Sequence, residues 1–289
     1  MKNLRLFSII TVYFGLMNTI FASDTVRHDS DILPVASTTG QISFSKELIN
    51  QYLLADIAAS RGKFFFAAKS MKNAAEIAGH AGLRLRAFNL AMQAKEFPLA
   101  LEIAEIKIPK THPDIQHDVM RLIVMVSLKK EKEVLESLKV LIKQQSMRNE
   151  ADALISIIRQ VFMNQEQPER WLSTISKAVE YYPSSASAQL ALAWFGFQIN
   201  NPTVTYKALT RSFIIAPAWE DAAMFKFSYH KKIEGIEFAF EYAEKFLASN
   251  PRKNRLRLLY AKALSEVKFN REALHEYIKL LESDPKNMD

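Results

Sequence analysis

The sequence contains no cysteine and only seven glycines in 289 residues. Without cysteine the chain has no disulfide framework, no cysteine nucleophile and no attachment site for the lipid of a bacterial lipoprotein. The scarcity of glycine argues against a β fold rich in turns and against a glycine-rich phosphate-binding loop. We therefore expect an all-helical protein whose stability comes from packing alone.

The sequence also lacks a strong excess of either charge, with 38 Lys and Arg against 31 Asp and Glu, or +7. Removal of residues 1–22 would take away Lys2 and Arg5 and leave 36 basic residues, a net charge of +5. This mild excess is typical of the solvated surface of a helical protein. We expect no nucleic-acid partner.

The start of the chain, from Met1 to Ala22, has the layout of a secretory signal peptide. Lys2 and Arg5 precede a run from Leu6 to Ala22 without any charge. We expect cleavage after Ala22 and a periplasmic location. The alternative is an uncleaved anchor in the inner membrane facing the periplasm, because Ile20 is larger than the residue usually found near a cleavage site. The uncharged run is short for a bilayer span of roughly 20 residues, so membrane contact is expected only if the segment is uncleaved.

Residues 23–41 contain Asp, Ser, Thr and Pro with few bulky apolar side chains, which predicts a flexible leader. From residue 42 to 289 the apolar side chains follow a helical period. Pro183, Pro217, Pro251 and Pro285 recur at one constant interval along the chain. A fixed period of this length, about 34 residues, indicates a stacked array of helix-turn-helix units.

Small residues such as Ala261 and Ala273 fall where the two helices of such a unit cross closely. Together with the proline spacing they resemble the tetratricopeptide repeat. The resemblance implies an all-α, right-handed α-solenoid of about seven repeats over residues 42–289. The repeats are expected at about 48–80, 81–117, 118–151, 152–185, 186–219, 220–253 and 254–287. Arg159 and Trp171 occupy positions that are usually small, which predicts a distorted helix crossing in the fourth repeat.

A narrower resemblance concerns the first two repeats, through the stretches 53–58 and 100–104. They are similar to the opening of outer-membrane tetratricopeptide adaptor lipoproteins of carboxyl-terminal processing proteases. The chain departs from these proteins because it lacks their lipid-bearing cysteine. Full adaptor activity is therefore not implied.

The sequence has no motif for catalysis. None of the six histidines is arranged with a glutamate as in a zinc protease helix, and no Gly-x-Ser-x-Gly elbow occurs. We expect a protein that is not an enzyme and that binds neither a cofactor nor a metal.

The family resemblance implies that the first helix of each pair lines a concave groove for a protein or peptide partner. The expected groove residues are Asn89, Met92, Leu122, Val126, Gln160, Met163, Leu190, Trp194, Phe197 and Met224. A basic rim is expected at Lys129, Lys130, Lys231, Lys232, Arg255 and Lys262. For Trp194 and Phe197 two interpretations stay open, because an aromatic residue at helical spacing can equally pack between repeats.

The expected function is thus an interaction scaffold or adaptor in the bacterial envelope. The alternative is a structural subunit that assembles with itself. The last helix carries a second apolar stripe, Leu274, Ile278 and Leu281, on the side where a further repeat would stack. We expect this stripe to contact a second copy or a partner subunit.

Overall fold

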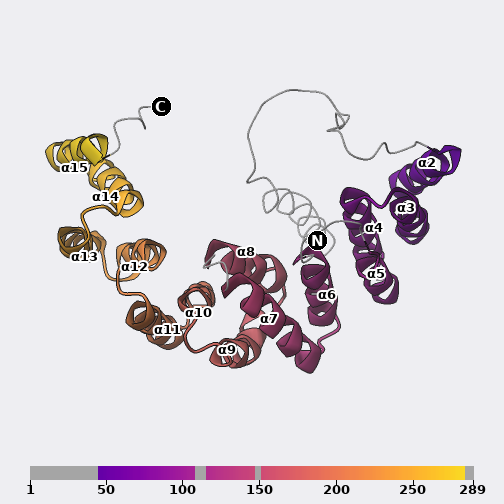
Figure 1. Cartoon of the computed structure of the whole chain (residues 1–289), viewed down its shortest axis with the longest axis horizontal. Helices are drawn as coiled ribbons and strands as arrows, with labels where there is room; N and C mark the ends of the chain where they lie inside the picture. The colour runs from indigo at the N-terminus through magenta and orange to yellow at the C-terminus, as the bar shows by residue number, and fades with distance from the viewer. Residues whose placement is uncertain (1–44, 108–114, 147–150, 284–289) are drawn as a thin grey trace, which may run out of the picture. The chain divides into compact units, whose positions relative to one another are not determined.

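The computed structural model describes residues 45–107, 115–146 and 151–283, and within them the chain is entirely helical (Figure 1). The expected signal peptide, the leader and Pro285 lie outside the described residues. No described helix is long and apolar enough to cross a membrane.

The described helices follow one another as seven consecutive pairs (Figure 1). The pairs are α2 (Lys46–Ser60) with α3 (Phe64–Ala78), α4 (Ala81–Gln93) with α5 (Phe97–Ala104), α6 (Ile115–Ser127) with α7 (Glu131–Ser146), α8 (Ala151–Phe162) with α9 (Leu172–Glu180), α10 (Ala186–Gln198) with α11 (Pro202–Ile215), α12 (Glu220–Ile233) with α13 (Ile236–Ser249), and α14 (Asn254–Glu266) with α15 (Asn270–Ser283).

The helices group into two compact units. Among the described residues, the first unit contains those up to Gln144 together with Ser156–Ala178. The second unit contains the short stretch from Gln145 to Ile155 and everything from Val179 onward. Each unit is described by itself below.

In the second unit the repeat period is visible in the helix boundaries. The first helices of its three pairs begin at Ala186, Glu220 and Asn254, and the second helices begin at Pro202, Ile236 and Asn270. The number of residues between successive helix starts equals the interval between successive prolines of the sequence. Pro183, Pro217 and Pro251 each lie shortly after a helix ends, because proline cannot donate the backbone hydrogen bond that would continue it.

The turn inside six of the seven pairs contains one residue with a positive φ angle. These residues are Gly62, Lys95, Lys129, Asn200, Gly235 and Lys268. A single left-handed residue after the last helical turn ends a helix and reverses the chain within a short distance. The turn between α8 and α9 is longer, and the 3₁₀-helix Pro168–Trp171 precedes α9 there.

Small side chains are buried where the helices of a pair cross. Ala261 and Ala273 are both in the core of the last pair. In α10 the backbone comes close to α11 at Gly196, where an added Cβ would lie 3.0 Å from the Thr205 hydroxyl oxygen. Alanine at this position would require its neighbours on α11 to move by a few tenths of an ångström, so glycine fits the close crossing best.

Neighbouring pairs of the second unit are joined through positions about one repeat apart. The Glu220 carboxylate accepts a hydrogen bond of 3.0 Å from the backbone N–H of Leu256, in the first turn of α14. Lys253 precedes α14 and provides no side-chain cap, so the preceding repeat supplies this cap. The Phe227 and Tyr260 rings meet at 6.4 Å between centroids.

The first unit shows the same kind of junction. Arg86 of α4 donates a hydrogen bond of 2.7 Å to the Tyr52 hydroxyl of α2 and pairs with Asp56. Arg84 is buried and donates to the Ile106 carbonyl at 3.0 Å, which fixes the chain segment after α5. Cross-repeat polar contacts therefore supplement the apolar core in both units.

The fourth pair departs from the simple arrangement at the position where the sequence indicates distortion. Trp171 ends the 3₁₀-helix, is buried, and lies 5.8 Å from the Phe162 ring of α8. A large ring thus fills a position that is small in the other pairs.

Candidate functional site

The structure divides the expected groove residues into buried and accessible ones. Leu122, Val126 and Leu190 are at most 1% exposed. Gln160 and Trp194 are also buried, at 5% and 8%. These five side chains are core residues rather than groove residues, because a ligand can reach almost none of their surface. For Trp194 the structure favours the interpretation as core.

Helix α10 explains part of this difference. All residues from Ser187 to Gly196 are buried, so this helix is enclosed on every side. Its sequence is apolar around its whole circumference, which is typical of a buried helix. A rule that assigns one face of each first helix to a groove fails for such a helix.

The other expected groove residues are half-buried and therefore accessible. Asn89, Met92 and Met163 belong to the first unit, and Phe197 and Met224 belong to the second. Met224 also packs partly against the core of the last two pairs. The accessible part of the expected groove in the second unit thus begins at Phe197, at the end of α10.

Three aromatic side chains gather around that point. The Phe197 ring lies 5.8 Å from the Phe225 ring and 5.8 Å from the Tyr229 ring, both on α12. All three are half-buried. Phe225, Tyr229 and Lys232 follow the i, i+4, i+7 spacing and so share one face of α12. We call Phe197, Phe225, Tyr229 and Lys232 the aromatic surface.

Lys232 places a positive charge on this surface. Its Nζ lies 4.8 Å from the centroid of the Phe197 ring, a distance typical of a cation–π contact. Within the described residues Lys232 forms no ion pair. The amine is exposed and remains accessible to an acidic group of a ligand.

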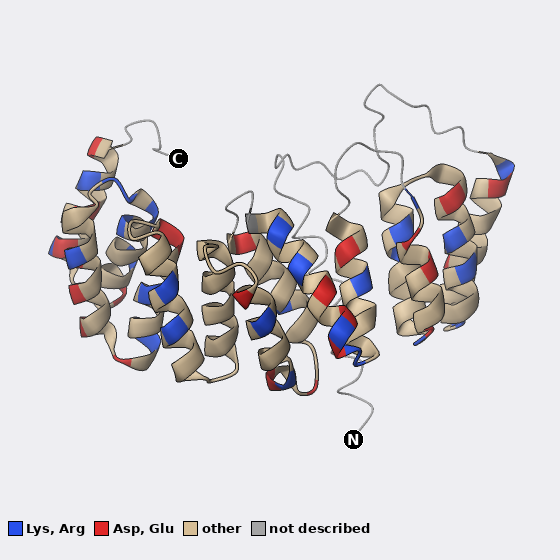
Figure 2. Ribbon diagram, turned by 60° about the horizontal axis from the view of Figure 1, so that its bottom comes forward, with Lys and Arg blue, Asp and Glu red and all other residues tan. Residues whose placement is uncertain are grey.

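The rest of the expected basic rim is exposed but differs in pairing. Lys231 contacts Glu266 at 2.5 Å and Arg255 contacts Asp221 at 2.5 Å, so both pairs join α12 to α14. Lys262 is exposed without an ion pair among the described residues. Lys129 and Lys130 lie in the first unit, in the turn between α6 and α7. Figure 2 shows that basic and acidic residues are distributed along the helices.

Lys226 occupies another face of α12. Its Nζ lies 4.7 Å from the Tyr242 ring and 5.6 Å from the Phe213 ring. Burial lowers the pKa of Lys226 below its ordinary value, because these rings replace water around the ammonium group. Burial also raises the pKa of Tyr242, whose hydroxyl forms no hydrogen bond with the described residues. This lysine therefore helps to hold α11, α12 and α13 together.

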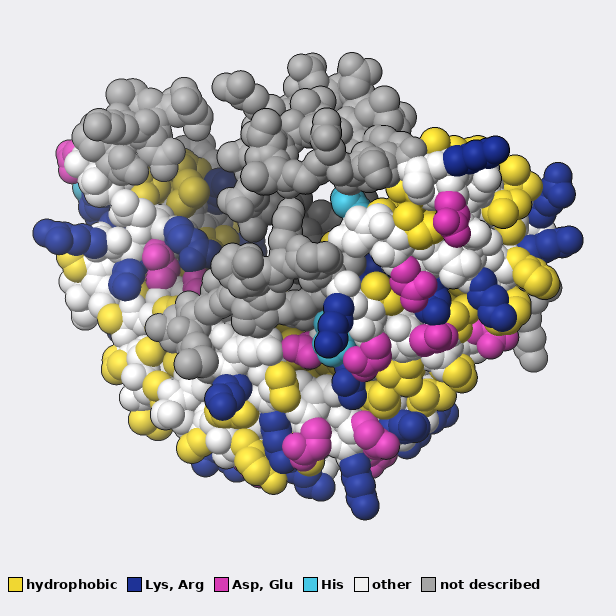
Figure 3. Space-filling view, turned by 45° about the vertical axis from the view of Figure 1, so that its right-hand side comes forward, with side chains coloured by type: hydrophobic (Ala, Val, Ile, Leu, Met, Phe, Trp, Pro, Cys, Tyr) yellow, Lys and Arg dark blue, Asp and Glu magenta, His cyan; other side chains and the backbone are white. Residues whose placement is uncertain are grey.

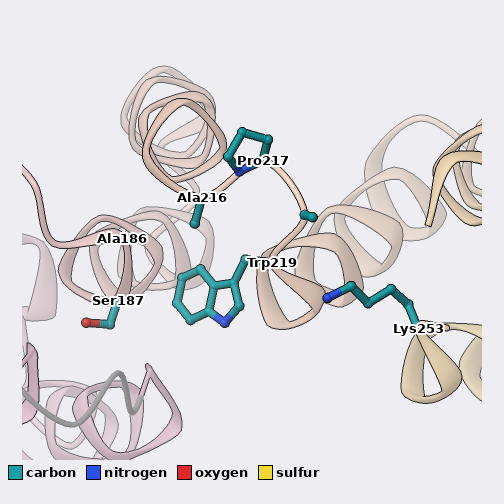
Figure 4. A pocket seen from close by; sticks show the side chains of 7 residues that line it. Ala186, Ser187, Ala216, Pro217, Trp219 and Lys253 are labelled. Carbon is teal, nitrogen blue, oxygen red and sulfur yellow. The ribbon is translucent and has the colours of Figure 1, made fainter.

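A hollow of about 360 Å³ lies at the other end of the same pairs (Figure 4). The Trp219 indole lies between the start of α10, at Ala186 and Ser187, and the Lys253 side chain. Trp219 directly precedes α12, and Lys253 directly precedes α14. At such positions Ser, Thr, Asp or Asn usually caps the helix, but neither Trp219 nor Lys253 provides a side-chain cap. The hollow offers one aromatic wall and one amine.

Among the residues that the structure describes, no group of three His, Asp or Glu side chains is arranged to hold a metal ion. On the face shown in Figure 3, acidic, basic and apolar side chains are interspersed. The aromatic surface can bury an apolar or aromatic side chain of a ligand, and its Lys232 can pair with an acidic side chain.

Sequence reasoning missed Phe225 and Tyr229. The expected groove residue on α12 is Met224, which adjoins Phe225 in the chain. A signal was available, because the aromatic pair has the i, i+4 spacing that places two side chains on one face. Their contact with Phe197 joins two repeats and is not visible in either helix alone.

The paired helices, the constant spacing of their starts and the buried small residues define an all-α array of helix pairs of the tetratricopeptide type. No protein-family model and no curated protein matches the chain. Two solved structures that are similar to it are a crystal structure of MamA and one of YrrB. The MamA structure is 19% identical over 61% of this chain and 98% of its own, with a TM-score of 0.38.

The YrrB structure is described as "a TPR protein with an unusual peptide-binding site". It is 19% identical over 64% of this chain and 95% of its own, with a TM-score of 0.31. At TM-scores this low, neither likeness carries an argument about what this chain binds. The site must be argued from the residues of the chain itself.

Proposed function

We propose that this chain is a non-enzymatic protein–protein interaction scaffold, and that the aromatic surface of its second unit binds an extended or helical peptide. The partner segment carries an apolar or aromatic side chain and, beside it, an acidic one. The apolar side chain packs on Phe197, Phe225 and Tyr229, and the acidic one pairs with Lys232.

The observation that supports this proposal is the accessible aromatic cluster with an unpaired cation. Contiguous apolar patches on a protein surface often mark a contact, and three adjoining half-buried rings are therefore a candidate contact. Aromatic residues also give large contact area at small entropic cost, and they dominate binding energy in many interfaces. Lys232 adds selectivity for an acidic group, because its neighbours Lys231 and Arg255 already have acidic partners.

The proposed location is the periplasm, with Met1–Ala22 removed as a signal peptide. Its support is the sequence pattern of Lys2 and Arg5 before the uncharged run. Mass measurement of the exported protein tests this, and we expect a chain that begins at Ser23. A mass that retains Met1 in a protein found with the inner membrane would establish the anchored alternative.

The binding test compares the wild type with the double variant Phe225→Ala/Tyr229→Ala in a pull-down from an envelope fraction. Loss of two aromatic contacts should weaken a partner by about 2 kcal/mol or more, roughly thirtyfold. The matched control is Phe238→Ala on α13, since Phe238 is also an exposed aromatic residue of this unit. We expect the partner to bind the wild type and the control but not the double variant.

Two further variants locate the contact. Lys232→Glu should abolish binding of an acidic partner while leaving the helicity unchanged. Trp219→Ala tests the hollow beside Trp219 and Lys253, and we expect little effect on the partner. A partner that is lost with Trp219→Ala and retained by the double variant would show that the aromatic surface is not the binding site.

A further inference from the structure

The two end helices of the described array expose residues at positions through which α13 and α14 contact one another. In α15 these are Leu274, Ile278 and Leu281, which are 44–60% exposed. Counted from the start of each helix, the same three positions of α13 hold Phe240, Glu244 and Leu247. The sets correspond because α13 and α15 begin one repeat apart.

In α13 these positions contact the following pair. The Phe240 ring lies 5.4 Å from the Tyr260 ring of α14. The Glu244 carboxylate accepts a hydrogen bond of 2.7 Å from the Tyr260 hydroxyl. Leu247 is buried at the same junction. Leu274, Ile278 and Leu281 therefore form a surface for contact with a further repeat, and no described residue covers it.

Helix α2 exposes the matching surface at the other end. The turns after α2 and α14 contain the positive-φ residues Gly62 and Lys268, which align the two helices. In this alignment Leu54 corresponds to Tyr260, and Ile57 corresponds to Ala263. Tyr260 and Ala263 are buried, whereas Leu54 and Ile57 are 55% and 48% exposed.

The second repeat supports the same correspondence. Counted back from its turn residue Lys95, the matching positions of α4 hold Ala87 and Leu90, and both are buried. Among its described residues α2 buries only Leu48 and Ala55. It therefore has the surface of a first helix whose preceding repeat is not supplied by the described chain.

The residues of the two ends match each other pair by pair. Where Glu244 meets Tyr260 within the chain, a junction between the two ends would bring Ile278 to Leu54. Within the chain, Tyr52 of the first repeat contacts Arg86 of the second. At a junction between the two ends, the corresponding residues would be Leu258 of α14 and Leu53 of α2. These two polar pairs of internal junctions are thus replaced by apolar pairs, and all four end residues are exposed.

This agreement on both sides distinguishes the ends from isolated exposed residues. Tyr206 of α11, for example, occupies the position of Leu274 in an earlier pair and is also exposed. Tyr206 lies inside the described array, where no exposed apolar set on a neighbouring first helix matches it. Single exposed apolar side chains are common and need no explanation, whereas matched sets indicate an interface.

We propose that copies of this chain associate head to tail, with α14 and α15 of one copy packed against α2 of the next. The contact continues the stacking of repeats across two chains. It is heterologous, since different surfaces meet, and it can propagate to further copies unless the rotation between them closes a ring.

Two variants remove one surface each. Leu274→Glu/Ile278→Glu changes the α15 surface, and Leu54→Glu/Ile57→Glu changes the α2 surface. All four residues are exposed, so each variant should keep the circular dichroism of the wild type. A charge placed against an apolar surface should raise the concentration at which association is half complete by at least about tenfold. The control is Ile214→Glu on α11, because Ile214 is exposed outside both surfaces.

Sedimentation or light scattering over a range of concentrations gives the result. We expect the average mass of the wild type and the control to rise with concentration, and each double variant to stay monomeric. An equimolar mixture of the two double variants should give a dimer, since each supplies the surface that the other lacks.

A wild type that stays monomeric at several hundred micromolar would overturn the proposal. Association that survives the α2 variant but not the α15 variant would also overturn it, because two α15 surfaces would then meet each other. A monomeric mixture of the two variants would show that the ends do not bind one another. If the full chain stays monomeric and only a chain without residues 1–44 associates, the occupant of α2 in the full chain is not a second copy, and the proposal is overturned in the same way.

Discussion

The buried ion pair in the last described repeat allows a quantitative prediction. Arg257 of α14 pairs with Glu276 of α15, and their side chains are 7% and 10% exposed. Arg257 also donates a hydrogen bond of 2.9 Å to the Pro251 carbonyl, and Lys279 donates one of 2.6 Å to Glu276. The pair therefore links the two helices to each other and to the loop before them.

Replacement of Glu276 by glutamine keeps the size of the side chain and removes its charge. The guanidinium of Arg257 then stays buried without a counter-charge, which should cost about 3 kcal/mol. In a repeat array this loss is local, because each repeat contacts only its neighbours. Hydrogen exchange of the α14 and α15 amides measures it, and we expect exchange about a hundredfold faster there.

The double variant Arg257→Met/Glu276→Leu is the control. It replaces the pair by apolar side chains of similar size, so stability should return to within about 1 kcal/mol of the wild type. If Glu276→Gln accelerates exchange less than about fivefold, the pair is hydrated and the reasoning from burial fails. If the double variant is as unstable as the single one, the two residues do not act as a pair.

The pH dependence of the same repeat follows from the pKa of Glu276. Burial alone would raise this pKa, but hydrogen bonds from Lys279 and Arg257 outweigh burial and hold it below the ordinary value. The stabilising contribution is thus fully present at neutral pH. It is lost as the pH falls below about 4.3 toward the lower pKa of the folded state. Glu276→Gln should remove this part of the acid sensitivity.

Three other substitutions test the fold. Gly235→Ala should destabilise the array by about 1–3 kcal/mol in thermal unfolding, because φ +116° and ψ 163° is a conformation that almost only glycine adopts; a cost near zero would contradict this backbone geometry. Trp194→Ala should cost about 3–5 kcal/mol in denaturant unfolding, since the ring is buried; unchanged stability would return Trp194 to the binding surface. Glu220→Ala should cost about 1 kcal/mol through the cap on Leu256, seen as faster hydrogen exchange in the first turn of α14 alone.

The helical repeat could be predicted because its signals are local and recur. Proline at a fixed spacing shows where each second helix ends, and small residues such as Ala261 show where helices cross. The close crossing at Gly196 does not follow from these positions. A single glycine inside a helix has no periodic signature, and its role depends on Thr205 of the partner helix.

The site could be predicted only in part, because exposure depends on neighbours that a single helix does not reveal. Phe197 is half-buried and Lys232 is exposed, whereas Leu190 and Trp194 are buried within the apolar helix α10. The apolar circumference of α10 was a readable signal, since a helix that faces solvent on one side carries polar residues there.

The two proposed surfaces are compatible, because they use different helices. The aromatic surface lies on α10 and α12, whereas the head-to-tail contact uses α2, α14 and α15. An assembly would then present one aromatic surface per copy, and a partner with two binding segments would gain apparent affinity of up to about 10²–10⁴-fold where its linker spans two copies. The variant Leu274→Glu/Ile278→Glu should therefore weaken binding of a two-segment peptide at concentrations where the wild type assembles, and leave a one-segment peptide unaffected. Equal effects on both peptides would mean that α15 contributes to the peptide site itself.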